Sequence, residues 1–133
     1  MATRPKYKDP DLSIESRVDD LLSFLSLEEK VAQLYGMWAS ELINPATRQF
    51  EQEKAQKIIP HGAAHISRVG AVSMLPPEKS AELANAIQRF LVEETRLGIP
   101  AIVHEESCAG YLAKEATTFP QAIGLAATWE PEL

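Results

Sequence analysis

The chain has 133 residues, of which 45% are hydrophobic and 24% are charged, and its formal net charge at pH 7 is −6. This balance is typical of one globular domain and excludes a largely disordered chain. The acidic balance, without a basic stripe, argues against nucleic acid or an anionic membrane as the main partner, because both attract clustered Lys and Arg.

Cys108 is the single cysteine, so no internal disulfide is expected and nothing demands an oxidising compartment. The first residues are charged and lack the apolar core of a secretory signal. No stretch approaches the roughly 18 apolar residues of a membrane span. We therefore expect a cytoplasmic protein.

Residues 1–12 are predicted to be an extended lead-in, and residues 13–133 the folded part. Ser13 can cap a helix that ends near Ser26, with its apolar residues at helical spacing. Ser26 and Glu29 then match a capping box at the start of a second helix, which Gly36 is expected to end.

Residues 37–61 have a weaker pattern, with a turn at Asn44-Pro45 and a polar helix over 47–59. Trp38 could stack on a sugar, but the sequence favours a packing role for it. His61 and His65 are spaced to share a metal on a helix, yet Pro60 and Gly62 argue against a helix there. No metal site is expected.

A strand over 66–74, a long helix ending near Leu97 and a strand over 99–103 together predict a βαβ unit, whose two strands are parallel. Residues 122–128 are predicted to be another buried segment, in which Gly124 allows a neighbouring element to approach closely. The expected fold class is α/β. The two strands cannot close a barrel, so we expect the chain to be an incomplete part of a larger domain.

Three ionisable residues, His104, Glu105 and Glu106, come directly after the strand over 99–103. In parallel α/β proteins the loops after the strands build the site, so these are the candidate functional residues. Glu105 and Glu106 should point in opposite directions on an extended backbone. Only one of them is expected to face a pocket, and the other to pair with a neighbouring element.

Three blocks of the sequence, in the same order, resemble the N-terminal barrel domain of glycoside hydrolase family three: YKDPDLSIESRVDDLLSFLSLEEKVAQL, HGAAHISRV and EETRLGIPAIVHEESCAGYLAKEATTFPQAIGLAATWEPEL. The resemblance implies a partial (β/α)8 TIM-type barrel made of N-terminal helices followed by the first βα units. It also implies that Glu106 binds hydroxyls of the sugar in subsite −1, with His104 and Glu105 as further candidate contacts.

The same resemblance implies a retaining, exo-acting β-glucosidase or β-xylosidase that needs no cofactor. Its nucleophile and acid/base are expected beyond Leu133, so the chain should be inactive alone. Independently of the resemblance, the chain is expected to fold poorly alone, because parallel strand edges and apolar helix faces would lack partners. The implied partners are a carbohydrate substrate and the remaining part of the same chain. Many family members carry a His where this chain has Ala109 before Gly110, which leaves the sugar preference open.

Three other interpretations remain open at this point. The chain could be a non-catalytic carbohydrate-binding relic of the barrel, or an unrelated α/β hydrolase that uses Glu105 or Glu106 as a general base. Cys108 could be a nucleophile, but the sequence suggests no Cys-His-Asn arrangement. A buried, inert thiol is the expectation for Cys108.

Overall fold

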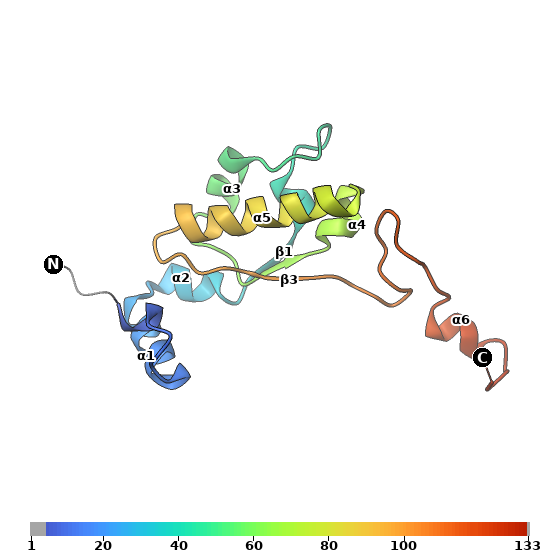
Figure 1. Ribbon diagram of the computed structural model, residues 1–133, viewed down its shortest axis with the longest axis horizontal. Coiled ribbons are helices and arrows are strands. Elements are labelled where there is room, and N and C mark those ends of the chain that lie inside the picture. Colours follow the sequence, from blue (N-terminus) through green and yellow to red (C-terminus); the bar gives the residue numbers. More distant parts are fainter. Residues whose placement is uncertain (1–4, 133) are drawn as a thin grey trace.

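A computed structural model describes residues 5–132, in which a small parallel sheet is flanked by helices (Figure 1). Its elements, in chain order, are η1 (Lys6–Lys8), α1 (Ile14–Phe24), α2 (Leu27–Ala32), β1 (Gly36–Trp38), η2 (Ala39–Leu42), α3 (Gln52–Ile58), β2 (His65–Ser67), α4 (Val69–Ser73), α5 (Pro77–Glu94), β3 (Ile102–His104) and α6 (Ala122–Ala126).

The three strands pair in parallel in the order β1-β2-β3, which confirms the predicted α/β class and the βαβ unit. The unit runs from β2 through α4 and α5 to β3. The predicted partial barrel is not confirmed, because the described residues form only an open sheet of three strands.

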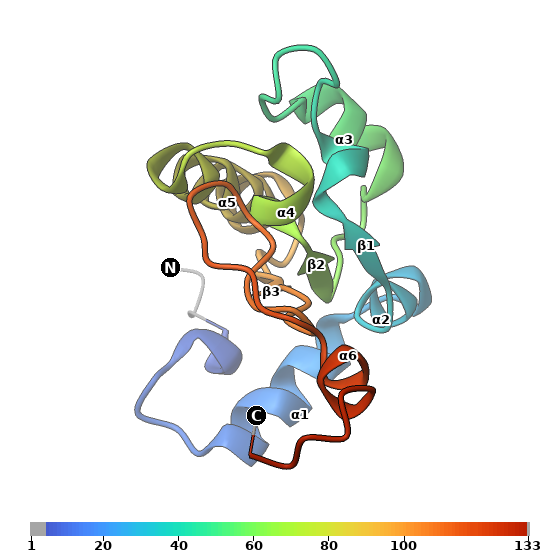
Figure 2. The ribbon, with the colours of Figure 1, turned by 90° about the vertical axis from the view of Figure 1, so that its right-hand side faces the viewer.

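The hydrophobic core lies on one side of this sheet. Met37 and Ile66 occupy one row across β1 and β2 and are 4% and 0% exposed. They belong to a buried cluster with residues of η2, α3 and α5, including Leu42, Ala55, Ile87 and Leu91. Figure 2 shows α4 and α5 stacked beside the strands on this side.

Residues that alternate with this row point to the opposite face of the sheet. At the two outer strands these residues are exposed, Trp38 by 51% and Ile102 by 62%. An apolar residue so exposed in a parallel strand is unusual, because parallel sheets are normally covered on both faces. This chain therefore presents one sheet face without a covering layer among the described residues.

The N-terminal helices start where the sequence predicts. The Ser13 hydroxyl accepts a hydrogen bond from the Ser16 amide, and Ser26 with Glu29 forms the complete capping box. The second helix ends at Ala32, earlier than predicted, and Gly36 begins β1 instead of ending a helix. The carbonyl of Tyr35 accepts hydrogen bonds from the Ala64 and His65 amides, so pairing with the chain before β2 competes with a longer helix.

Several other predicted bounds are wrong. The strand expected over 66–74 ends at Ser67, because Arg68 has a left-handed backbone (φ 63°) and α4 follows. The polar helix expected over 47–59 is α3, Gln52–Ile58, since the preceding loop is closed by a backbone hydrogen bond from Asn44 to Gln49. The last strand begins at Ile102, after Pro100, which has no amide to donate.

The segment over 122–128 was predicted to be buried, and this prediction is wrong. Its residues form the exposed helix α6, in which Ile123 is 78% exposed. A Cβ atom at Gly124 would meet nothing within 4 Å, so the predicted close approach at this glycine is also wrong. Figure 1 shows α6 standing apart from the sheet at the end of an extended segment. No neighbouring element within residues 5–132 covers it.

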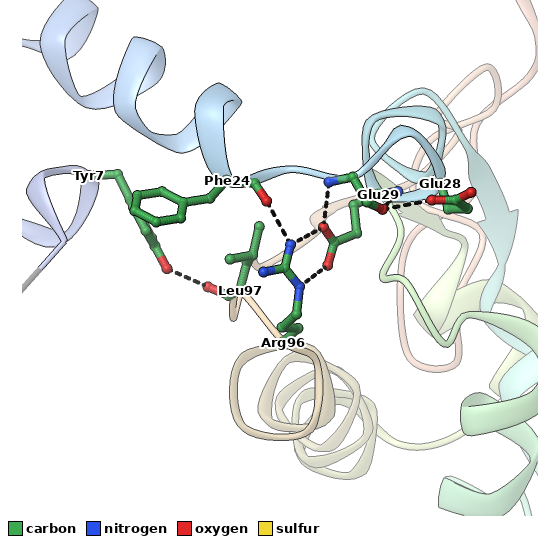
Figure 3. A network of polar contacts seen from close by, with 7 residues as sticks. Tyr7, Phe24, Glu28, Glu29, Arg96 and Leu97 are labelled. Carbon is green, nitrogen blue, oxygen red and sulfur yellow. Dashed lines mark hydrogen bonds and ion pairs between the residues drawn. The ribbon is translucent and has the colours of Figure 1, made fainter.

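Part of the predicted extended lead-in forms the short helix η1, and Tyr7 within it contacts the folded part. The Tyr7 amide donates to Asp20, and its hydroxyl donates to the Leu97 carbonyl at 3.2 Å. Figure 3 shows this contact beside a second one, in which Arg96 binds Glu29 and the Phe24 carbonyl. Both tie α1 and α2 to the loop between α5 and β3.

Within residues 5–132 no helix is long and apolar enough to cross a membrane.

Candidate functional site at the carboxyl edge of the sheet

The candidate site lies where the three parallel strands end. Trp38 ends β1, Arg68 follows β2, and His104 ends β3 with Glu105 and Glu106 directly after it. Strand register pairs Trp38 with Ser67 and Ser67 with His104, so these ends lie side by side. The three residues predicted from the sequence are therefore all at the edge where parallel α/β folds bind their ligands.

Glu106 reaches across to the connection after β2. Its Oε2 atom accepts a hydrogen bond from Arg68 Nη1 at 3.0 Å, and the carboxylate side chain is 60% exposed. Among the described residues no donor contacts its other oxygen. One oxygen is thus held by a cation, while the other is free to accept hydrogen bonds from a ligand.

Arg68 is held from two directions. Its backbone amide donates to the His104 carbonyl at 2.9 Å, which fixes the left-handed turn beside β3. Its guanidinium lies over the Trp38 ring, 5.2 Å from the ring centroid, at a distance typical of a cation–π contact. The Arg68 side chain is 23% exposed, and its Nε atom is buried without a partner among residues 5–132.

Glu105 turns away from Glu106 toward α4. Its Oε1 atom accepts a hydrogen bond from the Gly70 amide at 2.7 Å, and its Oε2 atom is buried with no partner in the described chain. Tyr111 lies against Gly70, where a Cβ atom would overlap its hydroxyl. Burial, and secondly the charge of Glu105, raise the pKa of Tyr111.

The two glutamates therefore diverge, as their alternation on the backbone predicts. Both reach the same connection, Glu106 through Arg68 and Glu105 through Gly70. This differs from the expectation that only one of them pairs with a neighbouring element, because Arg68 and Gly70 bracket the short turn into α4.

His104 contacts Arg68 through its backbone carbonyl, whereas its ring contacts His65. The carbonyl holds Arg68, and the imidazole lies edge-on to that of His65, with 5.5 Å between ring centroids. Trp38, for which packing is predicted, is 51% exposed and contacts Arg68 instead of the core. Trp38 is exposed because it ends the outer strand β1. The sequence does not predict β1, so this position could not be foreseen.

Sequence reasoning missed Arg68 as a member of the site. Its position was hidden inside the strand predicted over 66–74; a strand ending at Ser67 would have placed it beside His104. Cys108 is exposed, which contradicts the expected buried thiol, because few elements cover the segment after β3. Within residues 5–132 no three His, Cys, Asp or Glu side chains gather in a way that could hold a metal ion.

Comparison with known proteins connects this arrangement to a family. The glycosyl hydrolase family 3 N-terminal domain matches residues 26–133. A protein of Formosa agariphila named as a β-xylosidase is 35% identical over 130 residues, covering 96% of this chain and 17% of that protein. Proteins named as β-glucosidase C from Emericella nidulans and Aspergillus oryzae are 31% and 32% identical over 138 residues, covering 97% and 96% of this chain.

The chain spans only 17% to 22% of the length of these relatives. The family match nevertheless includes all three strands and every residue of the candidate site. The chain belongs to glycosyl hydrolase family 3, and the match lies in the N-terminal domain of that family.

Proposed function

We propose that this chain forms the first part of a (β/α)8-type barrel in a glycoside hydrolase, which removes terminal β-linked glucose or xylose with retention of configuration. The family match and the names of the relatives support the class of reaction. The parallel βαβ arrangement and the uncovered sheet face support a larger barrel, because additional strands would extend β3 and enclose that face.

The observation that carries the proposal is the geometry of Glu106. An exposed carboxylate at the carboxyl edge of the sheet, with one oxygen paired and one free, can accept hydrogen bonds from neighbouring sugar hydroxyls. In this proposal Glu106 binds the sugar in subsite −1 and does not break the bond. A retaining hydrolase also needs a nucleophile and an acid/base, and we propose that both lie beyond Leu133.

His104 and Glu105 are proposed as secondary contacts. Glu105 already holds the Gly70 amide, so it could reach a sugar only through Oε2, the buried oxygen that has no partner among residues 5–132. The His104 ring lies edge-on to the His65 ring, and the His104 carbonyl accepts the hydrogen bond from the Arg68 amide. We expect their replacement to cost less activity than that of Glu106.

The test uses the complete protein and the substitution Glu106→Gln. The wild type should hydrolyse chromogenic β-xylosides or β-glucosides, and the product released first should keep the β configuration by NMR. Gln keeps the shape but removes the charge, so kcat/KM should fall about 10- to 100-fold, the range for a hydrogen bond to a charged group.

Glu82→Gln is the matched control, because Glu82 also pairs with a cation but does so on the exposed side of α5. It should retain wild-type kcat/KM. Wild-type activity that survives Glu106→Gln unchanged would remove Glu106 from the site. A complete protein that binds methyl β-xyloside without cleaving any glycoside would instead be a carbohydrate-binding relic.

A further inference from the structure

We propose that Arg68 is a positioning residue, which holds Glu106 in the orientation that binds sugar, and that Trp38 in turn holds Arg68. The inference rests on the proposed function, since it concerns the same site. It adds two residues, from the ends of β1 and β2, that form one row of contacts with Glu106 after β3.

The position of Arg68 is fixed by its backbone conformation, independently of the contacts of its side chain. A positive φ at a non-glycine residue is uncommon and persists where surrounding contacts fix it. Here the amide hydrogen bond to the His104 carbonyl ties that turn to β3, only two residues before Glu106. The separation between the Arg68 and Glu106 backbones is therefore set by the sheet itself.

The side chain of Arg68 suits both of its contacts. Guanidinium is planar, so it can lie over the Trp38 ring and donate from its edge to the Glu106 carboxylate. A Lys ammonium is a compact point charge without a planar face, and it would keep the charge but lose this double contact. The arrangement thus specifies an arginine.

The pair differs from an ordinary surface ion pair. Lys79 and Glu82 join two side chains that are 59% and 63% exposed on one helix, whereas Arg68 is 23% exposed and spans two strand ends. Its buried Nε has no partner among residues 5–132, a cost that an apolar side chain would avoid. Retaining the charge is therefore better explained by what it does to Glu106 than by stability.

The decisive experiment is a double-mutant cycle on the complete protein, with Arg68→Ala, Glu106→Gln and the two combined. If Arg68 acts through Glu106, Arg68→Ala should lower kcat/KM about 10-fold or more, and the double variant should be no worse than Glu106→Gln alone. Added guanidinium ion should restore much of the activity of Arg68→Ala but none of that of Glu106→Gln. Trp38→Leu should give a smaller loss in the same direction.

Other results would overturn either the positioning role of Arg68 or the proposed function on which it rests. Additive losses in the cycle, or wild-type kcat/KM in Arg68→Ala, would overturn the positioning role while leaving the proposed function intact. If Arg68→Ala does not fold, Arg68→Lys replaces it: wild-type kcat/KM in that variant would overturn the need for a guanidinium, and a partial loss would support it. If the wild type cleaves no β-glycoside, the proposed function fails and this inference fails with it. Lys79→Ala removes an exposed cation that pairs with Glu82, not with Glu106, and is the control expected to match the wild type.

Discussion

Glu29 is the buried charged residue among residues 5–132, although it takes no part in the candidate site. Its side chain is 8% exposed and accepts two hydrogen bonds from Arg96, with Nε to Oε1 at 2.8 Å and Nη2 to Oε2. The Ser26 amide also donates to it, at 2.8 Å. These contacts, the Arg96 pair first, hold the pKa of Glu29 below its ordinary value of 4.5.

A lowered carboxyl pKa makes local stability depend on pH in a definite direction. The stabilisation from Glu29 should be fully present above about pH 4.5 and should be lost as the pH falls through the lowered pKa of the folded state. Hydrogen exchange of the α2 amides in the complete protein, corrected for intrinsic rates, should show protection that declines over this acidic range.

Substitution separates Glu29 from its neighbour. Arg96→Met should remove most of this pH dependence, because it removes the largest cause of the shift. Glu28 also has a lowered pKa, caused first by a backbone hydrogen bond and then by Ser26, but it is exposed and does not touch Arg96. Glu28→Gln should therefore keep the dependence. Equal pH profiles for wild type and Arg96→Met would contradict the assignment.

At the scale of elements, the side chain of Gln88 in α5 pairs with the backbone just before β3, as a neighbouring strand would. Gln88 donates from Nε2 to the Ala101 carbonyl at 2.7 Å, and its Oε1 accepts from the Ala101 amide at 3.0 Å. Ala101 is 7% exposed, so neither of its backbone groups has free access to water. The crossover helix thereby fixes the start of the strand that carries His104, Glu105 and Glu106.

Removing this attachment should loosen β3 without unfolding α5. Gln88→Ala leaves two buried backbone groups unpaired, at a cost of about 1–3 kcal/mol. The Ala101 amide in the complete protein should then exchange about 5- to 160-fold faster. Glu93→Gln, on an exposed part of the same helix, should leave exchange at Ala101 unchanged. Unchanged exchange in Gln88→Ala would show that other contacts hold the strand.

The elements that the sequence predicts well are those with strong local signals. Caps at Ser13 and Ser26 and the long apolar face of α5 lie within a few residues of their expected places. The strands have only three residues each, too few for periodicity, and β1 was missed for this reason. Arg68 depends on a hydrogen bond to His104, 36 positions away in number, so no local pattern could place it.

At the scale of the whole molecule, the chain exposes more surface than its mass requires. Its accessible area is 9131 Å², whereas a compact monomer of 14.7 kDa is expected to expose about 6,900 Å². Part of the excess is apolar: Ile102 in β3 is 62% exposed, and Ile123 and Trp129 near α6 are 78% and 91% exposed. Ile102 lies on the uncovered face of the sheet. Ile123 lies in α6, the helix that stands apart from the sheet in Figure 1.

This surface predicts that residues 1–133 fold poorly when expressed alone. The free edge of β3 offers unpaired backbone groups to other chains, and the exposed apolar residues favour self-association. We expect a broad thermal transition and poorly dispersed amide resonances for this segment, but sharp unfolding and protected β3 amides in the complete protein. A cooperative transition with dispersed resonances from the segment alone would contradict this, because the three-stranded sheet would then need no further strands to be stable.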